Sequence, residues 1–188
     1  MPLIVRGSGF AKLLASSSGI TYSSGDKCID KTGNTWCATS TMLTDNIAVI
    51  AYSDIITGNI YVMVVNMSKP GKLYCGKPTL IVAGNNMDEE MAYATEIVRL
   101  NDETALIAYL VKGDYSKKKV YYKLLAINEL NISSEKSGEL FSAELPTYYH
   151  DAVGLVNLED NKILAACVTT NSRLCARVIT LSNQTVTL

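Results

Sequence analysis

The chain has 188 residues, of which 48% are hydrophobic and 19% are charged, and its formal net charge is -1. This balance excludes intrinsic disorder and supplies enough apolar surface for a substantial core. The largest basic cluster is three lysines at 117–119, and no apolar run reaches the roughly 18–20 residues that span a membrane, so neither nucleic-acid binding nor membrane insertion is expected.

Residues 1–38 form an N-terminal segment that differs from the rest of the chain. It is rich in Ser-Gly turns, and the residues around Gly33 predict a hairpin or a degenerate repeat unit. Its start lacks the basic and apolar regions of a signal peptide, so we expect synthesis in the cytoplasm without export by that route.

An apolar motif then occurs three times, at 43–52, 100–109 and 158–167, with spacings of 57 residues (43 to 100) and 58 residues (100 to 158). Three aspartates and three alanines recur at fixed positions in the copies: Asp45, Asp102, Asp160, Ala51, Ala108 and Ala166. An internal repeat of this period is typical of repeat architectures.

The three units are expected at 39–90, 91–150 and 151–188, the last of them truncated. In the first unit, turn residues separate β-prone segments at 38–43, 47–52, 60–67 and 79–83. The second unit repeats this order at 95–100, 104–111, 120–127 and 139–143, and the third at 153–158, 163–168, 174–181 and 185–188. Helical periodicity is nearly absent, with one helical turn at most over 89–96.

An antiparallel four-stranded unit of this length corresponds to a β-propeller blade. The segment 47–52 is apolar throughout, which predicts an inner strand with a neighbouring unit on each side, and the repeated alanines predict close approach where units converge. Three units are too few to close a ring. Residues 1–38 supply a degenerate blade, the native chain continues past residue 188, or another subunit completes the ring; the last two explanations are favoured. The predicted fold class is therefore all-β, with propeller-like blades that are incomplete in this chain.

The repeated aspartates Asp45, Asp102 and Asp160 all fall in the turn before the apolar strand. A carboxylate there accepts backbone N–H groups two residues further on, which favours a structural role. The alternative is a ring of acids around a channel.

The sequence holds no constellation typical of catalysis, a metal site or a cofactor site. Its one histidine, His150, has no partner ligands at ordered spacing, and no phosphate loop or nucleophile elbow occurs. We therefore predict a protein that is not an enzyme and has no cofactor or metal. Loop carboxylates at Asp54, Asp114 and Asp151 leave a glycoside-acting enzyme as an alternative.

The five cysteines form no C-x-x-C motif and are expected to be buried free thiols. The alternative for one pair is that Cys28 and Cys37 face each other across a hairpin.

The hairpin loops of the three units are expected to project from one face and to form a binding surface. Asn, Asp and Tyr side chains suit sugar recognition because they hydrogen-bond hydroxyl groups and stack on sugar rings. The alternative is that these are ordinary turn residues. The candidate binding residues are Asp54, Asn59, Asp114, Tyr115, Asn171 and, on a connecting loop, Tyr149.

The motif from Leu43 to Asp54, followed by Gly58 and a Val-rich strand at 60–66, resembles the propeller-type repeats of phage tail and tail-fibre proteins. The resemblance implies a non-enzymatic structural or adhesion component of a virion or an extracellular phage-tail-like particle, made in the bacterial cytoplasm. It also implies other tail subunits as partners, a homo-oligomer, and a bacterial surface glycan as ligand.

A weaker resemblance links Asp30, Gly33, Thr35 and Trp36 to the Asp box of sialidase-like propellers, with one extra residue before the glycine and Cys28 where Ser is usual. The Asp box is a structural turn, so this resemblance concerns the fold. Two functional alternatives stay open: a glycoside-acting propeller enzyme and a bacterial protein-binding propeller scaffold.

Overall fold

The computed structural model describes residues 35–54, 56–69, 72–84, 92–112, 118–145, 153–159, 161–169, 173–182 and 185–187. Within these ranges the chain forms thirteen β-strands and no helix, and every strand pair is antiparallel. The all-β prediction is confirmed. The predicted helical turn at 89–96 is wrong from residue 92 onward, because those residues belong to a strand. Among the described residues no helix is long and apolar enough to cross a membrane.

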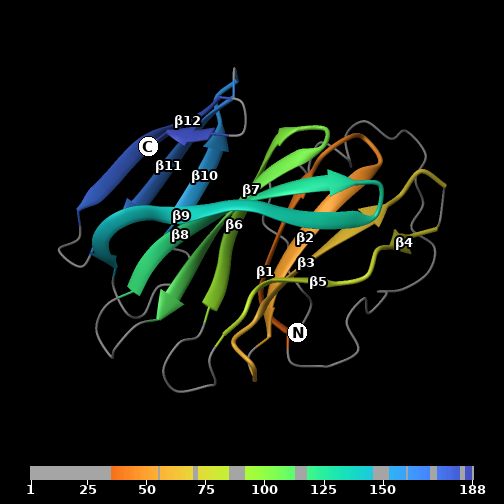
Figure 1. The fold of residues 1–188 in the computed structure, drawn as a ribbon, viewed down its shortest axis with the longest axis horizontal. Coiled ribbons are helices and arrows are strands. Elements are labelled where there is room, and N and C mark those ends of the chain that lie inside the picture. The colour runs from red at the N-terminus through yellow and green to blue at the C-terminus, as the bar shows by residue number, and fades with distance from the viewer. Residues whose placement is uncertain are drawn as a thin grey trace.

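The strands form three separate sheets, each a meander in chain order (Figure 1). The first sheet contains β1 (Thr35–Met42), β2 (Ile47–Asp54), β3 (Ile60–Asn66), β4 (Tyr74–Cys75) and β5 (Thr79–Val82). The second contains β6 (Ala92–Asn101), β7 (Thr104–Lys112), β8 (Lys118–Asn128) and β9 (Asn131–Leu145). The third contains β10 (Val153–Asn157), β11 (Lys162–Val168), β12 (Leu174–Ser182) and β13 (Thr185–Thr187).

The last strand of the first two sheets differs from the prediction. In the first sheet two short strands, β4 and β5, both pair with β3, so this sheet has five strands. In the second sheet β9 spans fifteen residues, whereas the sequence predicted only 139–143. Residues 133–137 of β9 are polar and exposed, so they lack the apolar alternation that marks a strand. Backbone pairing with β8, from Asn128–Asn131 to Lys118–Leu145, holds them in the sheet.

The second sheet is covered on both faces, as Figure 1 shows by its place between the other two. Residues 105–110 of β7 are all buried. The odd-numbered residues Ala105, Ile107 and Tyr109 pack with the first sheet. Leu106 and Leu110 face the other way, toward the third sheet. The alternation follows from the two-residue side-chain period of a strand, and burial on both faces explains why this segment is continuously apolar.

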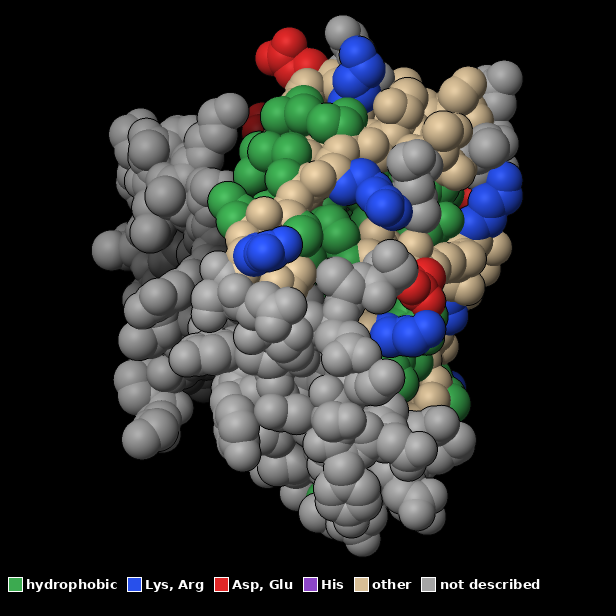
Figure 2. Space-filling view, turned by 90° about the vertical axis from the view of Figure 1, so that its left-hand side faces the viewer, with side chains coloured by type: hydrophobic (Ala, Val, Ile, Leu, Met, Phe, Trp, Pro, Cys, Tyr) green, Lys and Arg blue, Asp and Glu red, His purple; other side chains and the backbone are tan. Residues whose placement is uncertain are grey.

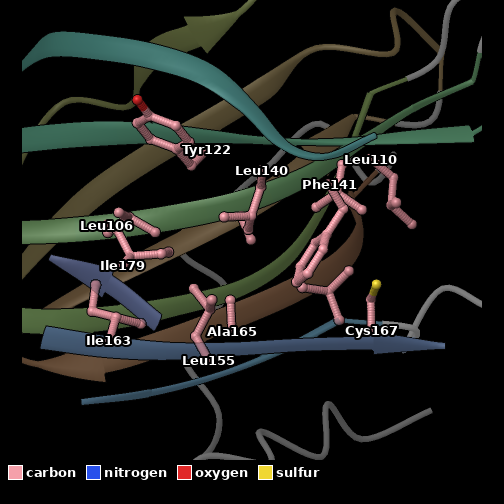
Figure 3. Close-up of a cluster of buried hydrophobic side chains, with 13 residues drawn as sticks. Leu106, Leu110, Tyr122, Leu140, Phe141, Leu155, Ile163, Ala165, Cys167 and Ile179 are labelled. Atoms are coloured by element: carbon pink, nitrogen blue, oxygen red, sulfur yellow. The ribbon is translucent and has the colours of Figure 1, made fainter. Parts of the chain in front are cut away.

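Two hydrophobic cores lie between the sheets. The first joins Val49 and Val62 of the first sheet to Ile97 and Ile107 of the second. The other joins the second sheet to the third and is drawn in Figure 3. Its members from the second sheet include Leu106, Leu110, Tyr122, Leu140 and Phe141, and those from the third include Leu155, Ile163, Ala165, Cys167 and Ile179.

Polar groups also bridge neighbouring sheets. The Asn157 side-chain amide donates to the Arg99 carbonyl over 2.7 Å, which joins β10 to β6. The Arg177 guanidinium donates to the Leu140 carbonyl over 3.1 Å, which joins β12 to β9. The Lys123 ammonium bonds the Ile81 carbonyl, which joins the second sheet to the first, and burial lowers the pKa of Lys123.

The strands closest to a neighbouring sheet are the first strands. β6 lies against both β1 and β10. The sequence analysis placed the convergence on 47–52, which is the second strand of its sheet, and this assignment is wrong. The apolar pattern reports burial by the layers above and below the strand. It does not report which edge of the sheet faces the neighbours.

The repeated turns are held by the residue before each aspartate. The Thr44 hydroxyl accepts the N–H groups of Asn46 (3.3 Å) and Ile47 (3.2 Å). In the second sheet the Asn101 side chain accepts the Glu103 N–H over 2.9 Å. Asp102 instead pairs with Arg99. Asp45 is exposed, and Asp160 lies outside the described residues. The predicted turn-capping role of Asp45 and Asp102 is therefore wrong by one position.

Candidate functional site

Two of the six predicted binding residues, Asp54 and Asn59, are described by the structure. They lie at opposite ends of the β2–β3 hairpin loop. The other four lie outside the described residues: Asp114, Tyr115, Tyr149 and Asn171.

Asp54 holds its own loop together. Its Oδ1 atom accepts the Ile56 N–H over 2.8 Å and the Thr57 N–H over 3.4 Å. The Asp54 carbonyl accepts the Gly58 N–H over 2.8 Å. One oxygen of this carboxylate is therefore engaged in the turn, as expected of an aspartate that starts a turn.

Asn59 ties the hairpin loop to the end of β5. Its Oδ1 atom accepts the Gly84 N–H over 2.8 Å, and its amide nitrogen donates to the Tyr61 hydroxyl over 3.1 Å. A Cβ atom added to Gly84 would lie 2.4 Å from backbone atoms of Gly58, so the two segments touch. Gly58 itself has a φ of 67°, which favours glycine. Both described candidates thus have roles in loop structure.

A polar groove lies at one end of the second sheet, where the β6–β7 turn meets the β8–β9 hairpin. The Ile127 N–H donates to the Glu103 carbonyl over 2.7 Å and fixes the turn against the hairpin. The groove has a volume of about 450 Å³, and its polar lining is Glu103, Thr104, Asn128, Asn131, Ser133 and Glu135. Ala126, Ile127 and Ile132 add an apolar part to the lining.

Sequence reasoning missed this groove because it left 128–138 without a structure. β8 and β9 are joined by the two-residue turn Glu129-Leu130, in which Glu129 has a φ of 54°. The available signal was Asn128 and Asn131 flanking a short break between the β-prone residues Ile127 and Ile132. Glu129 lacks the glycine or asparagine that usually marks such a turn.

The groove side chains are hydrogen-bonding groups of both kinds. Carboxylates and hydroxyls accept protons, while hydroxyls and the amides of Asn128 and Asn131 donate them. Such a set can bind a ligand that carries several hydroxyl groups. Over the described ranges no three His, Cys, Asp or Glu residues gather in a way that could hold a metal ion.

The four described cysteines are free thiols. Cys167 is buried, Cys37 and Cys175 are partly buried, and Cys75 is exposed, so the expectation of burial is wrong for Cys75. Cys28, and with it the Cys28–Cys37 pair, lies outside the described residues. Burial and the neighbouring Cys175 raise the pKa of Cys167 to about 11, which makes that thiol a poor nucleophile at neutral pH.

The described residues thus define an all-β protein of stacked antiparallel sheets with one polar groove at a sheet end. No protein-family model, no curated protein and no solved structure matches the chain.

Proposed function

We propose that this chain is a non-enzymatic adhesion component of a phage tail or phage-tail-like particle, and that the polar groove binds a glycan of the host surface. The phage-tail origin rests on the resemblance of the motif at 43–54. The groove formed by Glu103, Asn131 and their neighbours is the observation that carries the binding function.

We further propose that the three sheets act as blades of a propeller with a period of about 57 residues. Two observations support this arrangement. β6 lies against both β1 and β10, so successive sheets meet through their first strands. Each sheet is also a meander in chain order, which is the strand order of a blade. In such an assembly the scaffold supplies rigidity, and turns at the sheet ends meet the ligand.

A glycan suits the groove for three reasons. Sugars present adjacent hydroxyl groups that both donate and accept, and the groove offers amides, hydroxyls and carboxylates within one concavity. The apolar residues Ala126 and Ile132 provide a surface for the C–H face of a sugar ring. The hairpin that carries Asn128 and Asn131 is paired in the sheet on both sides of its turn, so little ordering is needed on binding.

The test is binding of the purified chain to a panel of bacterial surface glycans, compared with its Asn131→Ala variant. Loss of the hydrogen bonds made by one amide lowers affinity roughly tenfold, at about 1–1.5 kcal/mol. Asn46→Ala is the matched control, because Asn46 is also an exposed turn asparagine but belongs to the first sheet. It should leave binding unchanged.

Absence of binding to any host glycan would refute the adhesion function, and equal losses in the two variants would refute the groove as its site. Release of reducing ends from a bound polysaccharide would contradict the non-enzymatic part of the proposal.

A further inference from the structure

The outer face of the third sheet is apolar and faces solvent. In Figure 1 this sheet forms the left-hand layer, and Figure 2 looks onto that side of the molecule, where hydrophobic side chains gather. The exposed fractions are 56% for Val156, 42% for Val168, 74% for Leu174 and 48% for Val178. Antiparallel sheets with one wet face normally carry polar side chains there. β11 and β12 carry aliphatic side chains on both faces.

The face is continuous across three strands. Register pairs share a face, and Val156 pairs with Leu164, Leu164 with Val178, and Val168 with Leu174. Ala166 lies between them opposite Ala176. One formal charge, that of Lys162, occupies these positions on β10, β11 and β12, and the paired positions Thr180 and Thr187 are uncharged. We call this set the outer face.

The same register positions are buried in the other two sheets. Leu164 corresponds to Val49 and Leu106, which are fully buried against the next sheet along the chain. The cross-strand partners of these residues extend the comparison. Val178 corresponds to Val64 and Leu124, Leu174 to Ile60 and Val120, and Ala166 to Ala51 and Ala108. Twice in this chain a face of this composition is covered by another sheet.

The opposite end of the stack offers no counterpart. The far face of the first sheet carries Ala48, Tyr52, Met63 and Val65, and all four are buried. Head-to-tail stacking of chains would need that face to be open. The outer face of the third sheet is therefore best matched by the same face of another molecule, in the two-fold arrangement that is commonest among oligomers.

We propose that the outer face is a self-association surface, and that its occupant is the outer face of a second copy of this chain. Strands of this length, spaced as in a sheet, cover roughly 400 Å² per copy, or about 800 Å² in total. That area lies below the roughly 1,200–2,000 Å² of a stable complex. The dimer is therefore reversible and forms in the micromolar range or above.

Sedimentation velocity tests this over concentrations from a few micromolar to several hundred micromolar. The wild type should shift from monomer to dimer across the series. Val178→Lys places two desolvated ammonium groups in the dimer and should weaken association at least tenfold, a change of about 1.4 kcal/mol. Val178→Thr keeps the β-branched shape and should weaken association less.

Leu80→Lys is the matched control, since Leu80 is 49% exposed on β5 of the first sheet and makes no part of the outer face. It should dimerise like the wild type. Circular dichroism confirms that each variant is folded. A monomer at every concentration, a dimer that Val178→Lys does not weaken, or equal weakening by Leu80→Lys would each overturn the proposal. Glycan binding does not enter these measurements, so the adhesion proposal stands or fails separately.

Discussion

Ala108 and Ala166 occupy the same register position in neighbouring sheets, yet one is buried and the other is partly exposed. Ala108 pairs with Tyr122 and is fully buried between the second and third sheets. Ala166 pairs with Ala176 on the outer face, where no described residue covers it. Two alanines that the sequence presents as equivalent therefore have different environments.

This difference predicts unequal effects of the same substitution. Ala108→Leu adds three carbons to a packed interface and should lower the free energy of unfolding by about 1–3 kcal/mol. Ala166→Leu adds them to an open surface and should change it by less than about 0.5 kcal/mol. Urea unfolding at low protein concentration measures both. Equal destabilisation would show that the outer face is packed in solution.

Asn101 and Asp102 make a second comparison, in the β6–β7 turn. Asn101 accepts the Glu103 N–H, whereas Asp102 pairs with Arg99 at the surface. Asn101→Ala should destabilise the protein by about 1 kcal/mol, because it removes a hydrogen bond that holds the turn. Asp102→Ala should have a smaller effect, since exposed ion pairs contribute little. The order of the two unfolding midpoints checks this, and the reverse order would restore the role to the repeated aspartate.

Gly84 and Gly154 allow a third test. A Cβ atom on Gly84 would lie 2.4 Å from the backbone of Gly58, whereas one on Gly154 would meet nothing within 4 Å. Gly84→Ala should therefore lower stability by about 1–3 kcal/mol. Gly154→Ala should be neutral or slightly stabilising, because alanine loses less backbone entropy on folding. Thermal unfolding of the two variants distinguishes these effects, and a tolerated Gly84→Ala would contradict the close contact.

Cys167 predicts a loss of stability in alkaline solution. Its pKa is raised from 9.0 to about 11, mainly by burial, so the folded protein holds this proton more tightly than the unfolded chain. The stabilisation is complete below pH 9 and is lost as the pH rises through 11. Two pKa units correspond to at most roughly 3 kcal/mol.

The pH dependence is best measured against Cys167→Ala, because the pKa of Tyr109 is also raised by burial and that residue contributes in the same region. Wild type should exceed the variant most at neutral pH, and the gap should narrow between pH 9 and 11. A gap that stays constant would show that the thiol does not titrate with unfolding.

The repeated strands carried most of the predictable information about the fold. Long apolar segments such as β2 and β7 were predicted at nearly their observed positions, because burial on both faces leaves a strong pattern. β9 was predicted over only a third of its length, since its exposed residues carry no such pattern. The groove was missed for the same reason: its hairpin turn uses Glu129 and Leu130, which are not typical turn residues.

A second repeated feature shows how register depends on the tertiary structure. Tyr52 stacks on Tyr61, and Tyr109 stacks on Tyr121, in both cases with ring centroids 5.8 Å apart. The repeat alignment places Tyr52 and Tyr109 together. The partners Tyr61 and Tyr121 are 60 residues apart (61 to 121), because the β7–β8 connection is longer. Only strand pairing reveals that these pairs are equivalent.

By itself, the sequence determined the strand class and the approximate place of the apolar strands, because side-chain periodicity and turn chemistry are local properties. The tertiary structure decided which face of each sheet is covered, which strand of a sheet meets its neighbour, and which polar residues come together at a sheet end. These features depend on the stacking of one sheet on the next, and a local pattern carries no record of what lies opposite it. The identical alanines Ala108 and Ala166 show the limit, since only the presence of a neighbouring sheet separates a buried position from an open one.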